Sequence, residues 1–419
     1  MIKAKLRNLY RNKKLSDLSV YGFGQAFNLV TPILVVPYII SICGIENYGK
    51  IGVALSLAFF LIVFIDYGSE IISVREISLQ RDNKVTVSEI FSTTQLAKTI
   101  MLFIIIGFCS LLFFAIPYFR NEFLLYIFTL SILIGQVVNP VWFLQGVENY
   151  KLITIVNVIS KLLYLTFVFL FIREESDYIF VNLYWGLGAI IANVGMLIYL
   201  NSHYKFKLLT KNFISARKYI VHNFALFTSQ LFTSLQMYLP IMLIGWLGSN
   251  VMAGQYKVIE QIVGIFRTYI LLSFNFLYPK ICYGMQESYK RTVKYWAVSN
   301  GINAVFVFVC LVVIGIYRVP IINYFTKADM LKLTALLLLA LLIPAIQAVQ
   351  IPLKQLLLAM NRNKVYVRIS FVQTLLILLL VVVSLVYYEL FAVIWAIIIS
   401  ELIISFAYLY FVLLYKEKS

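Results

Sequence analysis

The chain has 419 residues, of which 62% are hydrophobic and only 13% charged, and its formal net charge is +17. This composition lies far outside the range of water-soluble globular domains and excludes a soluble enzyme or binding module. Apolar runs of about twenty residues, the length that crosses the hydrocarbon core of a bilayer, recur from end to end. The sequence therefore predicts an all-α membrane protein.

We expect about twelve transmembrane helices, with boundaries good to about four residues. In chain order, they are expected at 18–40, 50–73, 92–117, 123–146, 152–172, 179–200, 218–245, 251–278, 295–317, 331–358, 365–388 and 390–414. The segments between them are short and polar, and even the longest, of about seventeen residues, is too short for a soluble domain. Segments of alternating hydrophobicity, typical of a transmembrane barrel, are absent.

An internal repeat divides these helices into two halves. Gln25 and Gly49 have the same spacing as Gln230 and Gly254 in the seventh and eighth spans, and the segment 142–151 resembles the segment 355–364. Six spans in each half give both halves the same membrane orientation, an arrangement typical of alternating-access transporters with a central cavity. The predicted parts are a basic tail at 1–17, a six-helix bundle at 18–200, a linker at 201–217, a six-helix bundle at 218–414 and a tail at 415–419.

The basic residues predict the orientation in the membrane. Of the 35 Lys and Arg, about 24 fall in the two tails and the even-to-odd joints, and about 6 in the opposite joints, so the first face is cytoplasmic by the positive-inside rule. Both termini should therefore lie in the cytoplasm. The same residues are spread over every cytoplasmic joint, which argues against nucleic-acid binding.

Motifs for several other chemistries are missing. The four cysteines have no C-x-x-C spacing and the two histidines lie in or beside one joint, so neither a disulfide framework nor a metal site is indicated. No G-x-x-x-x-G-K-[ST] motif is present, which argues against ATP as the energy source. We predict a protein that needs no cofactor.

Charged side chains inside the predicted spans are the candidate functional residues, because each costs roughly 3 kcal/mol at the centre of a helix in lipid. Lys161 lies ten residues, about 15 Å of helix, beyond Lys151 and thus near the bilayer midplane. Lys257, Glu260 and Arg267 form one polar stripe on the eighth span. Such groups must either pair with one another or face water.

Both outcomes are expected within this set. The acids Asp66 and Glu70, four residues apart on one helix face, together with Arg75 and Glu260, could couple an ion or pin helices together by ion pairs. For the bases, a cavity-lining role suits a phosphorylated or sugar-bearing substrate. The predicted substrate-binding residues are Lys161, Lys257, Arg267, Lys98, Gln25, Gln230, Gln145 and Trp142, of which Trp142 could stack on a sugar or simply anchor the helix.

Two segments resemble a known family. They are the N-terminal stretch with Gln25, Pro37, Gly44, Asn47-Tyr48-Gly49, Asp66-Tyr67-Gly68 and Arg75-Glu76, and the segment Trp142-Phe143-Leu144-Gln145-Gly146-Val147-Glu148 with Lys161 downstream. From the N-terminus to just beyond Lys161, the chain resembles the polysaccharide-unit flippases, the Wzx-type O-antigen translocases of the multidrug/oligosaccharidyl-lipid/polysaccharide exporter superfamily. The resemblance implies a V-shaped bundle that carries an undecaprenyl-pyrophosphate-linked oligosaccharide from the cytoplasmic to the periplasmic leaflet of a bacterial inner membrane.

Within that superfamily, relatives that flip the peptidoglycan precursor usually carry two extra helices, and drug exporters lack the W-F-x-Q-G-x-E segment. The resemblance thus implies a secondary transporter rather than an enzyme, with membrane lipids, a polysaccharide polymerase and chain-length machinery as partners. The transport step is expected to be driven by membrane potential or by H⁺ or Na⁺ antiport. Two alternatives stay open, a multidrug or organic-cation antiporter and, less favoured, a membrane-embedded polymerase or acyltransferase.

Overall fold

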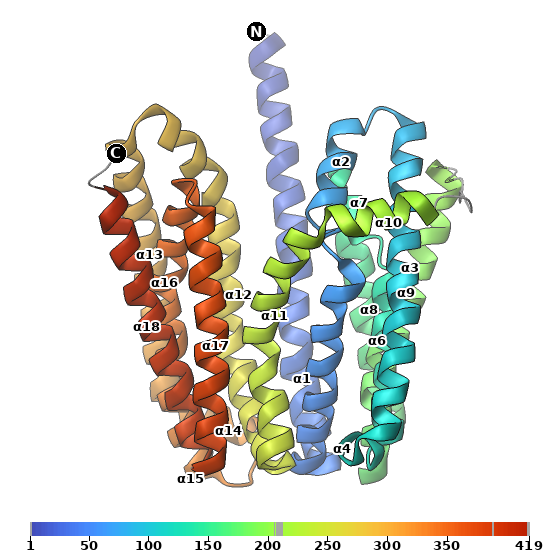
Figure 1. The fold of residues 1–419 in the computed structure, drawn as a ribbon, viewed down its shortest axis with the longest axis vertical. Helices are drawn as coiled ribbons and strands as arrows, with labels where there is room; N and C mark the ends of the chain where they lie inside the picture. Colours follow the sequence, from blue (N-terminus) through green and yellow to red (C-terminus); the bar gives the residue numbers. More distant parts are fainter. Residues whose placement is uncertain (1, 205, 207–212, 388, 417–419) are drawn as a thin grey trace. The chain divides into compact units, whose positions relative to one another are not determined.

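The computed structural model describes residues 2–204, 206, 213–387 and 389–416, with side chains described in these ranges except at 2–19, 21, 25, 213, 214, 222, 225, 226, 229, 286, 387, 415 and 416. Over these ranges every regular element is a helix and none is a strand (Figure 1). A helix satisfies all its backbone hydrogen bonds internally, as a segment in lipid must. The predicted all-α membrane fold is confirmed.

Eleven helices or helix runs among the described residues are long and apolar enough to cross a membrane. The first, Gly22–Asp66, has 45 residues and contains Gly44, whose φ of 79° and ψ of 165° are not helical and join two helices. A straight helix of that length would measure about 68 Å, more than twice the hydrocarbon core. It therefore holds both predicted spans at 18–40 and 50–73, and the eleven candidates account for the predicted twelve.

The chain divides into two compact units. The first consists of Met1–Gly44 and Ala54–Ser234, and the second of Ile45–Val53 and Leu235–Ser419. The predicted tails at 1–17 and 415–419 and the predicted linker at 201–217 lie partly outside the described residues. The five-part division made from the sequence stays a prediction.

The first unit is built on long helices with short helical connections. Its elements are most of α1 (Ile2–Asp66), α2 (Ile72–Gln80), α3 (Lys84–Ala115), α4 (Pro117–Arg120), α5 (Phe123–Thr129), α6 (Ser131–Val137), α7 (Val141–Gly146), α8 (Tyr150–Phe171), the 3₁₀ turn η1 (Glu175–Phe180), α9 (Val181–Tyr204) and α10 (Phe213–His222). In Figure 1, α3, α6, α8 and α9 run side by side, and contacts join α6 and α8 to α9. α11 (Phe224–Leu243) begins in this unit and ends in the second.

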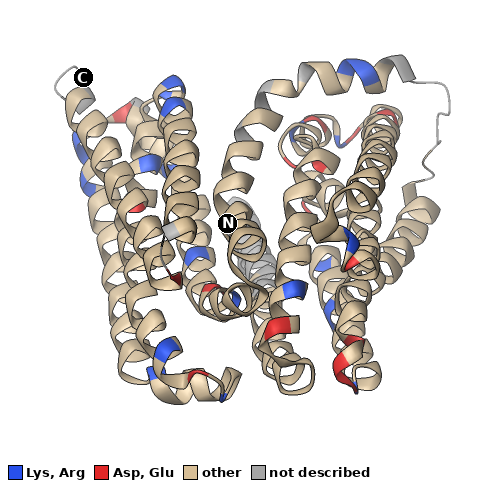
Figure 2. Cartoon of the chain, turned by 60° about the horizontal axis from the view of Figure 1, so that its bottom comes forward, with Lys and Arg blue, Asp and Glu red and all other residues tan. Residues whose placement is uncertain are grey.

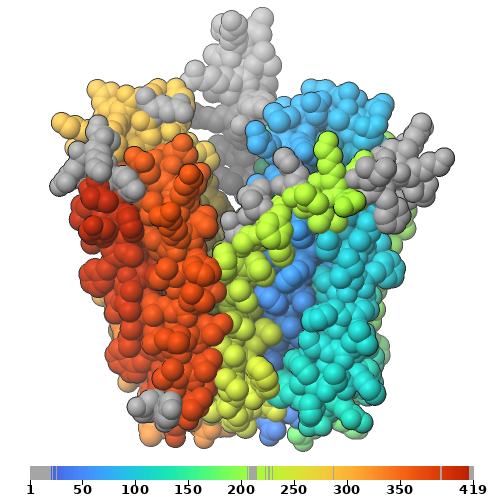
Figure 3. All heavy atoms as spheres, viewed as in Figure 1, coloured from blue at the N-terminus to red at the C-terminus, as the bar shows by residue number. Residues whose placement is uncertain are grey.

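The second unit has fewer and longer elements. They are a π-helical turn η2 (Ile244–Gly248), α12 (Asn250–Glu287), α13 (Tyr289–Ile316), α14 (Arg318–Phe325), α15 (Met330–Ala340), α16 (Leu342–Ala359), α17 (Asn363–Tyr387) and α18 (Leu390–Lys416). α16 packs against α12, α13 and α18, and α17 packs along α18, the orange and red helices on one face of this unit in Figure 3. Figure 2 shows long stretches of helix without a charged residue, interrupted by isolated blue and red positions.

The repeat that pairs the segment 142–151 with the segment 355–364 is also visible in the backbone, at the ends of α7 and α16. Glu148 and Asn361, which the pairing places at corresponding positions, both have a positive φ, 56° and 58°. The hydrogen bonds that close the two turns also correspond, Asn149 N–H to Leu144 O (2.8 Å) and Arg362 N–H to Leu357 O (3.2 Å). A left-handed residue closed by such a bond is a common way for a helix to end. The two halves thus share the conformation of this turn.

The other repeat, which pairs Gln25 and Gly49 with Gln230 and Gly254, places its two glycines at one helix crossing within the second unit. A Cβ atom at Gly49 would overlap the carbonyl oxygen of Asn250, and one at Gly254 would overlap the carbonyl oxygen of Ile45. The repeat that pairs Gly49 with Gly254 also pairs Ile45 with Asn250, so the contact is reciprocal in the manner of a two-fold axis. Glycine is required at both positions because the two backbones touch there.

Candidate functional site

The first unit holds a buried ion pair between two of the predicted residues. Lys98 Nζ lies 2.9 Å from Asp66 Oδ1, and the two side chains are only 2% and 7% exposed. Gln136 donates from Nε2 to both carboxylate oxygens of Asp66, at 3.0 and 2.9 Å. A buried carboxylate that meets one ammonium and one amide has its charge compensated, so this cluster joins the end of α1 to α3 and α6.

The cluster continues toward the W-F-x-Q-G-x-E segment. Asn139 donates to Gln136 Oε1 at 3.2 Å, and Lys98 Nζ lies 5.7 Å from the ring centre of Trp142. Trp142 is 2% exposed and stacks on Phe91, with ring centres 5.5 Å apart. The ring therefore belongs to an apolar core in this structure, while its predicted role in stacking on a sugar is untested.

Glu70 and Arg75, predicted near Asp66, both have exposed side chains. Glu70 lies in the connection between α1 and α2, outside the candidate membrane spans. Repulsion from the nearby Asp66 carboxylate raises the pKa of Glu70 to about 7. Glu70 is thus a carboxyl group whose charge changes near neutral pH.

Lys161 makes a different kind of contact. Its Nζ lies 3.3 Å from the ring centre of Trp185 on α9, and the side chain is half-buried. Trp185 is itself held edge-on by Tyr164, with ring centres 5.0 Å apart. Among the side chains described here, no carboxylate forms an ion pair with Lys161. An indole face attracts a cation without cancelling its charge, so the ammonium keeps the capacity to bind an anion.

The polar stripe predicted on the eighth span lies on α12. Lys257 Nζ pairs with Glu260 Oε2 at 2.7 Å, one turn further along the same helix. Lys257 is 8% exposed, and a Cβ at Gly52 would lie 3.1 Å from its Cγ. Lys257 and Glu260 therefore neutralise each other within one helix. The predicted role of Glu260 in ion coupling or helix pairing and the predicted role of Lys257 in substrate binding both stay untested.

Arg267, on the same helix, belongs to a second buried network. Its Nε donates to Gln347 Oε1 at 3.5 Å, and Gln347 Nε2 donates to Glu401 Oε1 at 2.8 Å. Gln373 donates to the other carboxylate oxygen of Glu401 at 3.1 Å. The network brings α12, α16, α17 and α18 together around a carboxylate that is 6% exposed.

The remaining predicted residues lie elsewhere. Gln145 is half-buried on α7, and Gln230 on α11 is half-buried with an Oε1 atom that has no hydrogen-bond partner among the described residues. The side chain of Gln25 lies outside the described residues. Among the described side chains, contacts within the first unit join Asp66 to Lys98, and contacts within the second join Lys257 to Glu260 and Arg267 to Gln347.

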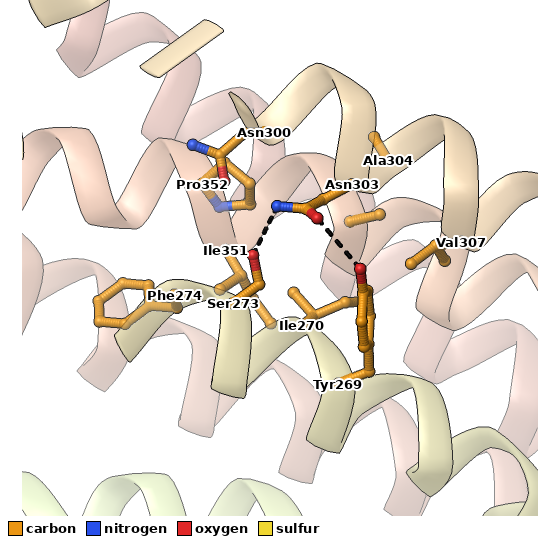
Figure 4. Close-up of a pocket in the computed structure, with 11 residues that line it drawn as sticks. Tyr269, Ile270, Ser273, Phe274, Asn300, Asn303, Ala304, Val307, Ile351 and Pro352 are labelled. Atoms are coloured by element: carbon orange, nitrogen blue, oxygen red, sulfur yellow. Dashed lines mark hydrogen bonds between the residues drawn. The ribbon is translucent and has the colours of Figure 1, made fainter. Parts of the chain in front are cut away.

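The neutral members of both networks were not predicted from the sequence; they are Gln136, Gln347 and Gln373. The available signal was a glutamine at mid-span, since an amide in hydrocarbon needs a partner almost as a charge does. A small pocket between α12, α13 and α16 was also missed (Figure 4). Its polar lining is satisfied internally, because Tyr269 donates to Asn303 Oδ1 at 3.0 Å and Asn303 donates to Ser273 Oγ at 2.6 Å.

Comparison with solved structures identifies the fold. The chain matches the inward-facing conformation of a multidrug resistance MATE family transporter of the MOP superfamily, with a TM-score of 0.73, 13% identity, and coverage of 94% of this chain and 96% of that one. It also matches the lipid II flippase MurJ in an inward closed conformation, with a TM-score of 0.67, 13% identity, and coverage of 93% and 86%. The arrangement of helices is that of these transporters.

Sequence comparison finds two bacterial relatives, both named "Putative O-antigen transporter". The relative from Escherichia coli (strain K12) is 21% identical over 61% of this chain, and the match spans 62% of the relative's length. The relative from Shigella dysenteriae is 21% identical over 69% of this chain and 72% of its own. Residues 15–285, more than half of the chain, match the family model described as polysaccharide biosynthesis protein. The chain is a multi-pass membrane protein that belongs to the polysaccharide biosynthesis protein family.

Proposed function

We propose that this protein carries an undecaprenyl-pyrophosphate-linked oligosaccharide, an O-antigen unit or a similar polysaccharide repeat, from the cytoplasmic to the periplasmic leaflet of a bacterial inner membrane. The supporting observation is Lys161, eleven residues into the membrane-spanning helix α8. Its ammonium rests on the ring of Trp185 at 3.3 Å without an acidic partner among the described side chains. A pyrophosphate supplies the negative charge that such a site lacks. The relatives' printed names support the same class of cargo.

The chemistry of the cargo suggests how its parts are divided. The polyprenyl tail stays in lipid, so no apolar surface is transferred to water. The pyrophosphate and the sugars, in contrast, need a hydrated path. Lys161 and Arg267 are the half-buried bases for the phosphates. Amide side chains such as Gln230 and Gln145 hold the glycan loosely. Weak binding is needed because the glycan must be released on the periplasmic side.

The transport step is alternating access, without ATP. Moving an anion outward across an inside-negative membrane yields about 2.3 kcal/mol per charge per 100 mV. Antiport of H⁺ or Na⁺ is the alternative driver, with Glu70 as one acid that titrates near neutral pH. A polysaccharide polymerase and chain-length machinery would take up the flipped unit, and both termini would lie in the cytoplasm.

The deciding experiment replaces Lys161 with Ala and uses Lys151→Ala as the matched control, because Lys151 is an exposed lysine near the start of the same helix. In cells that depend on this protein, Lys161→Ala should leave lipid-linked units accumulated on the cytoplasmic side, while Lys151→Ala transports normally. Drug resistance should be unchanged in both. Loss of drug efflux with undisturbed glycan export would instead favour the multidrug antiporter.

The driving force is measured separately in liposomes with clamped potential and clamped pH gradient. Flipping that follows the potential alone supports anion export by voltage, and flipping that follows the proton or sodium gradient supports antiport. Indifference to all gradients would eliminate both drivers.

A further inference from the structure

The helix α10 (Phe213–His222) differs in direction from the long helices of the first unit. It lies between the candidate span that ends at Tyr204 and the one that begins at Gln230, and it belongs to neither. In Figure 1 it runs across the direction of α3, and contacts join the two helices. A helix in this position lies near the plane of the membrane instead of crossing it.

The contact with α3 places α10 near the edge of the hydrocarbon core. The Tyr219 hydroxyl oxygen lies 2.9 Å from Ser73 Oγ, which in turn lies 2.9 Å from Thr94 Oγ1 of α3. Thr94 comes ten residues after the start of α3 and twenty-one before its end at Ala115, and those twenty-one residues rise by about 32 Å. A hydrocarbon core is about 30 Å thick, so α10 lies where acyl chains meet lipid headgroups.

The two faces of α10 have different surroundings. The inner face holds Ala216, which is fully buried, and Tyr219, whose hydroxyl bonds with the buried Ser73. The outer face carries two basic and two large apolar side chains, all of them exposed. They are Arg217, Lys218, Val221 and Phe224, of which Phe224 is the first residue of α11. Basic and apolar side chains on one exposed face are typical of a helix that binds a membrane surface.

The charged residues around α10 in the sequence are all basic. Between Asp177 and Glu260 the sequence has no acidic residue, and five lysines and arginines fall within residues 205–218. Among the side chains described, no acid forms an ion pair with Arg217 or Lys218. The outer face therefore keeps a positive charge that an anionic headgroup can neutralise.

We propose that the outer face of α10 is a binding surface for anionic phospholipids, in the leaflet that the basic residues predict to be cytoplasmic. Arg217 and Lys218 pair with the lipid phosphates, while Val221 and Phe224 enter between the upper parts of the acyl chains. These two apolar side chains are 69% and 59% exposed on the protein, so lipid contact removes their apolar surface from water. None of the four residues takes part in the proposed transport step.

The experiment measures, by mass spectrometry, how fast acetic anhydride labels individual lysines of the full-length protein in nanodiscs. The nanodiscs contain dioleoylphosphatidylcholine alone or an equimolar mixture with dioleoylphosphatidylglycerol. Lys218 should be labelled about fivefold more slowly in the mixed nanodiscs, because a nearby phosphate holds the amine in its protonated, unreactive form. Lys84, an exposed lysine about 15 Å before Thr94 on α3, is the internal control. It lies beyond the Debye length of about 8 Å, so its rate should change less than about twofold.

A variant tests the apolar part of the surface. Val221→Gln combined with Phe224→Gln keeps both bases but weakens insertion, so the fivefold difference at Lys218 should fall to about twofold. The matched control combines Leu79→Gln with Val85→Gln. These side chains are 71% and 69% exposed at the end of α2 and the start of α3, and their replacement should leave the difference at Lys218 unchanged.

Three results would overturn the inference, and none of them contradicts the proposed function. Equal labelling of Lys218 in the two kinds of nanodisc would mean that the outer face does not select anionic lipid. Equal slowing at Lys218 and Lys84 would reflect only the general potential of the membrane surface. Protection of Lys218 by added geranyl pyrophosphate, but not by phosphatidylglycerol, would assign the outer face to the cargo instead.

Discussion

The two units differ in how they treat a buried acid, although they share a backbone repeat. In the first unit, Asp66 meets Lys98 directly at 2.9 Å and Gln136 adds its amide. In the second unit, the described side chains that donate to Glu401 are amides, and Gln347 stands between it and Arg267. In both units the amide comes from the fourth predicted span of its half, whereas the acid and the base come from different helices.

This difference separates a structural ion pair from an adjustable one. A direct buried pair strongly opposes the removal of either partner, because the remaining charge would be uncompensated. A relayed pair leaves the cation half-buried and held by a long contact of 3.5 Å. The two halves thus share the backbone turn at Glu148 and Asn361, whereas their buried carboxylates at mid-span have different partners.

The largest expected effect comes from breaking the direct pair. Lys98→Met keeps much of the side-chain volume but leaves Asp66 buried without its cation, which should cost about 3–5 kcal/mol of stability. Thermal unfolding in detergent measures the loss. Lys84→Met, at an exposed position at the start of the same helix, should change stability by less than about 0.5 kcal/mol.

A double variant sharpens the test of the first unit. Asp66→Asn combined with Lys98→Met removes both charges and should be less destabilised than the sum of the two single variants. Additive losses would mean that the 2.9 Å contact does not couple the two residues, and the contrast between the units would then disappear.

The glycine crossing tests the shared backbone repeat. Gly49→Ala places a methyl group against the carbonyl of Asn250, and Gly254→Ala places one against Ile45, so each should cost about 3 kcal/mol because backbone cannot move aside as a side chain can. Gly107→Ala is the control, since a Cβ there meets no atom within 4 Å, and it should be neutral or slightly stabilising. Unequal costs at Gly49 and Gly254 in thermal unfolding would argue against a reciprocal contact.

Features that depend on the length of apolar runs and on internal repetition could be predicted from the sequence. The spans, the repeat and the family resemblance were all predictable, and so was the position of Lys257 and Glu260 on one helix face, because residues three apart share a face. The contact of Asp66 with Lys98 was not, since it depends on which faces of α1 and α3 meet. The amides Gln347 and Gln373 carry no charge, so the free-energy cost of placing a charge in lipid did not identify them.

Removing the relay amide tests the second unit. Gln347→Leu deprives Glu401 of one donor and Arg267 of its acceptor, and leaving buried polar groups unpaired should cost about 2 kcal/mol, less than Lys98→Met. The thermal midpoint reports the loss, and Gln80→Leu, at an exposed position on α2, is the control. A loss as large as that of Lys98→Met would mean that the relayed network is as rigid as the direct pair.

The smallest effect comes from the turn that the two halves share. Glu148 and Asn361 both have a positive φ, a conformation that costs an ordinary side chain about 1 kcal/mol but that Asn tolerates. Glu148→Gly should therefore stabilise the protein by up to about 1 kcal/mol, reduced by loss of the contact with Arg81, which is worth little because both side chains are about half-exposed. Asn361→Gly should change the midpoint hardly at all. If Asn361→Gly stabilised the protein more than Glu148→Gly did, the strain at the two positions would not depend on the residue type, and the prediction would be wrong.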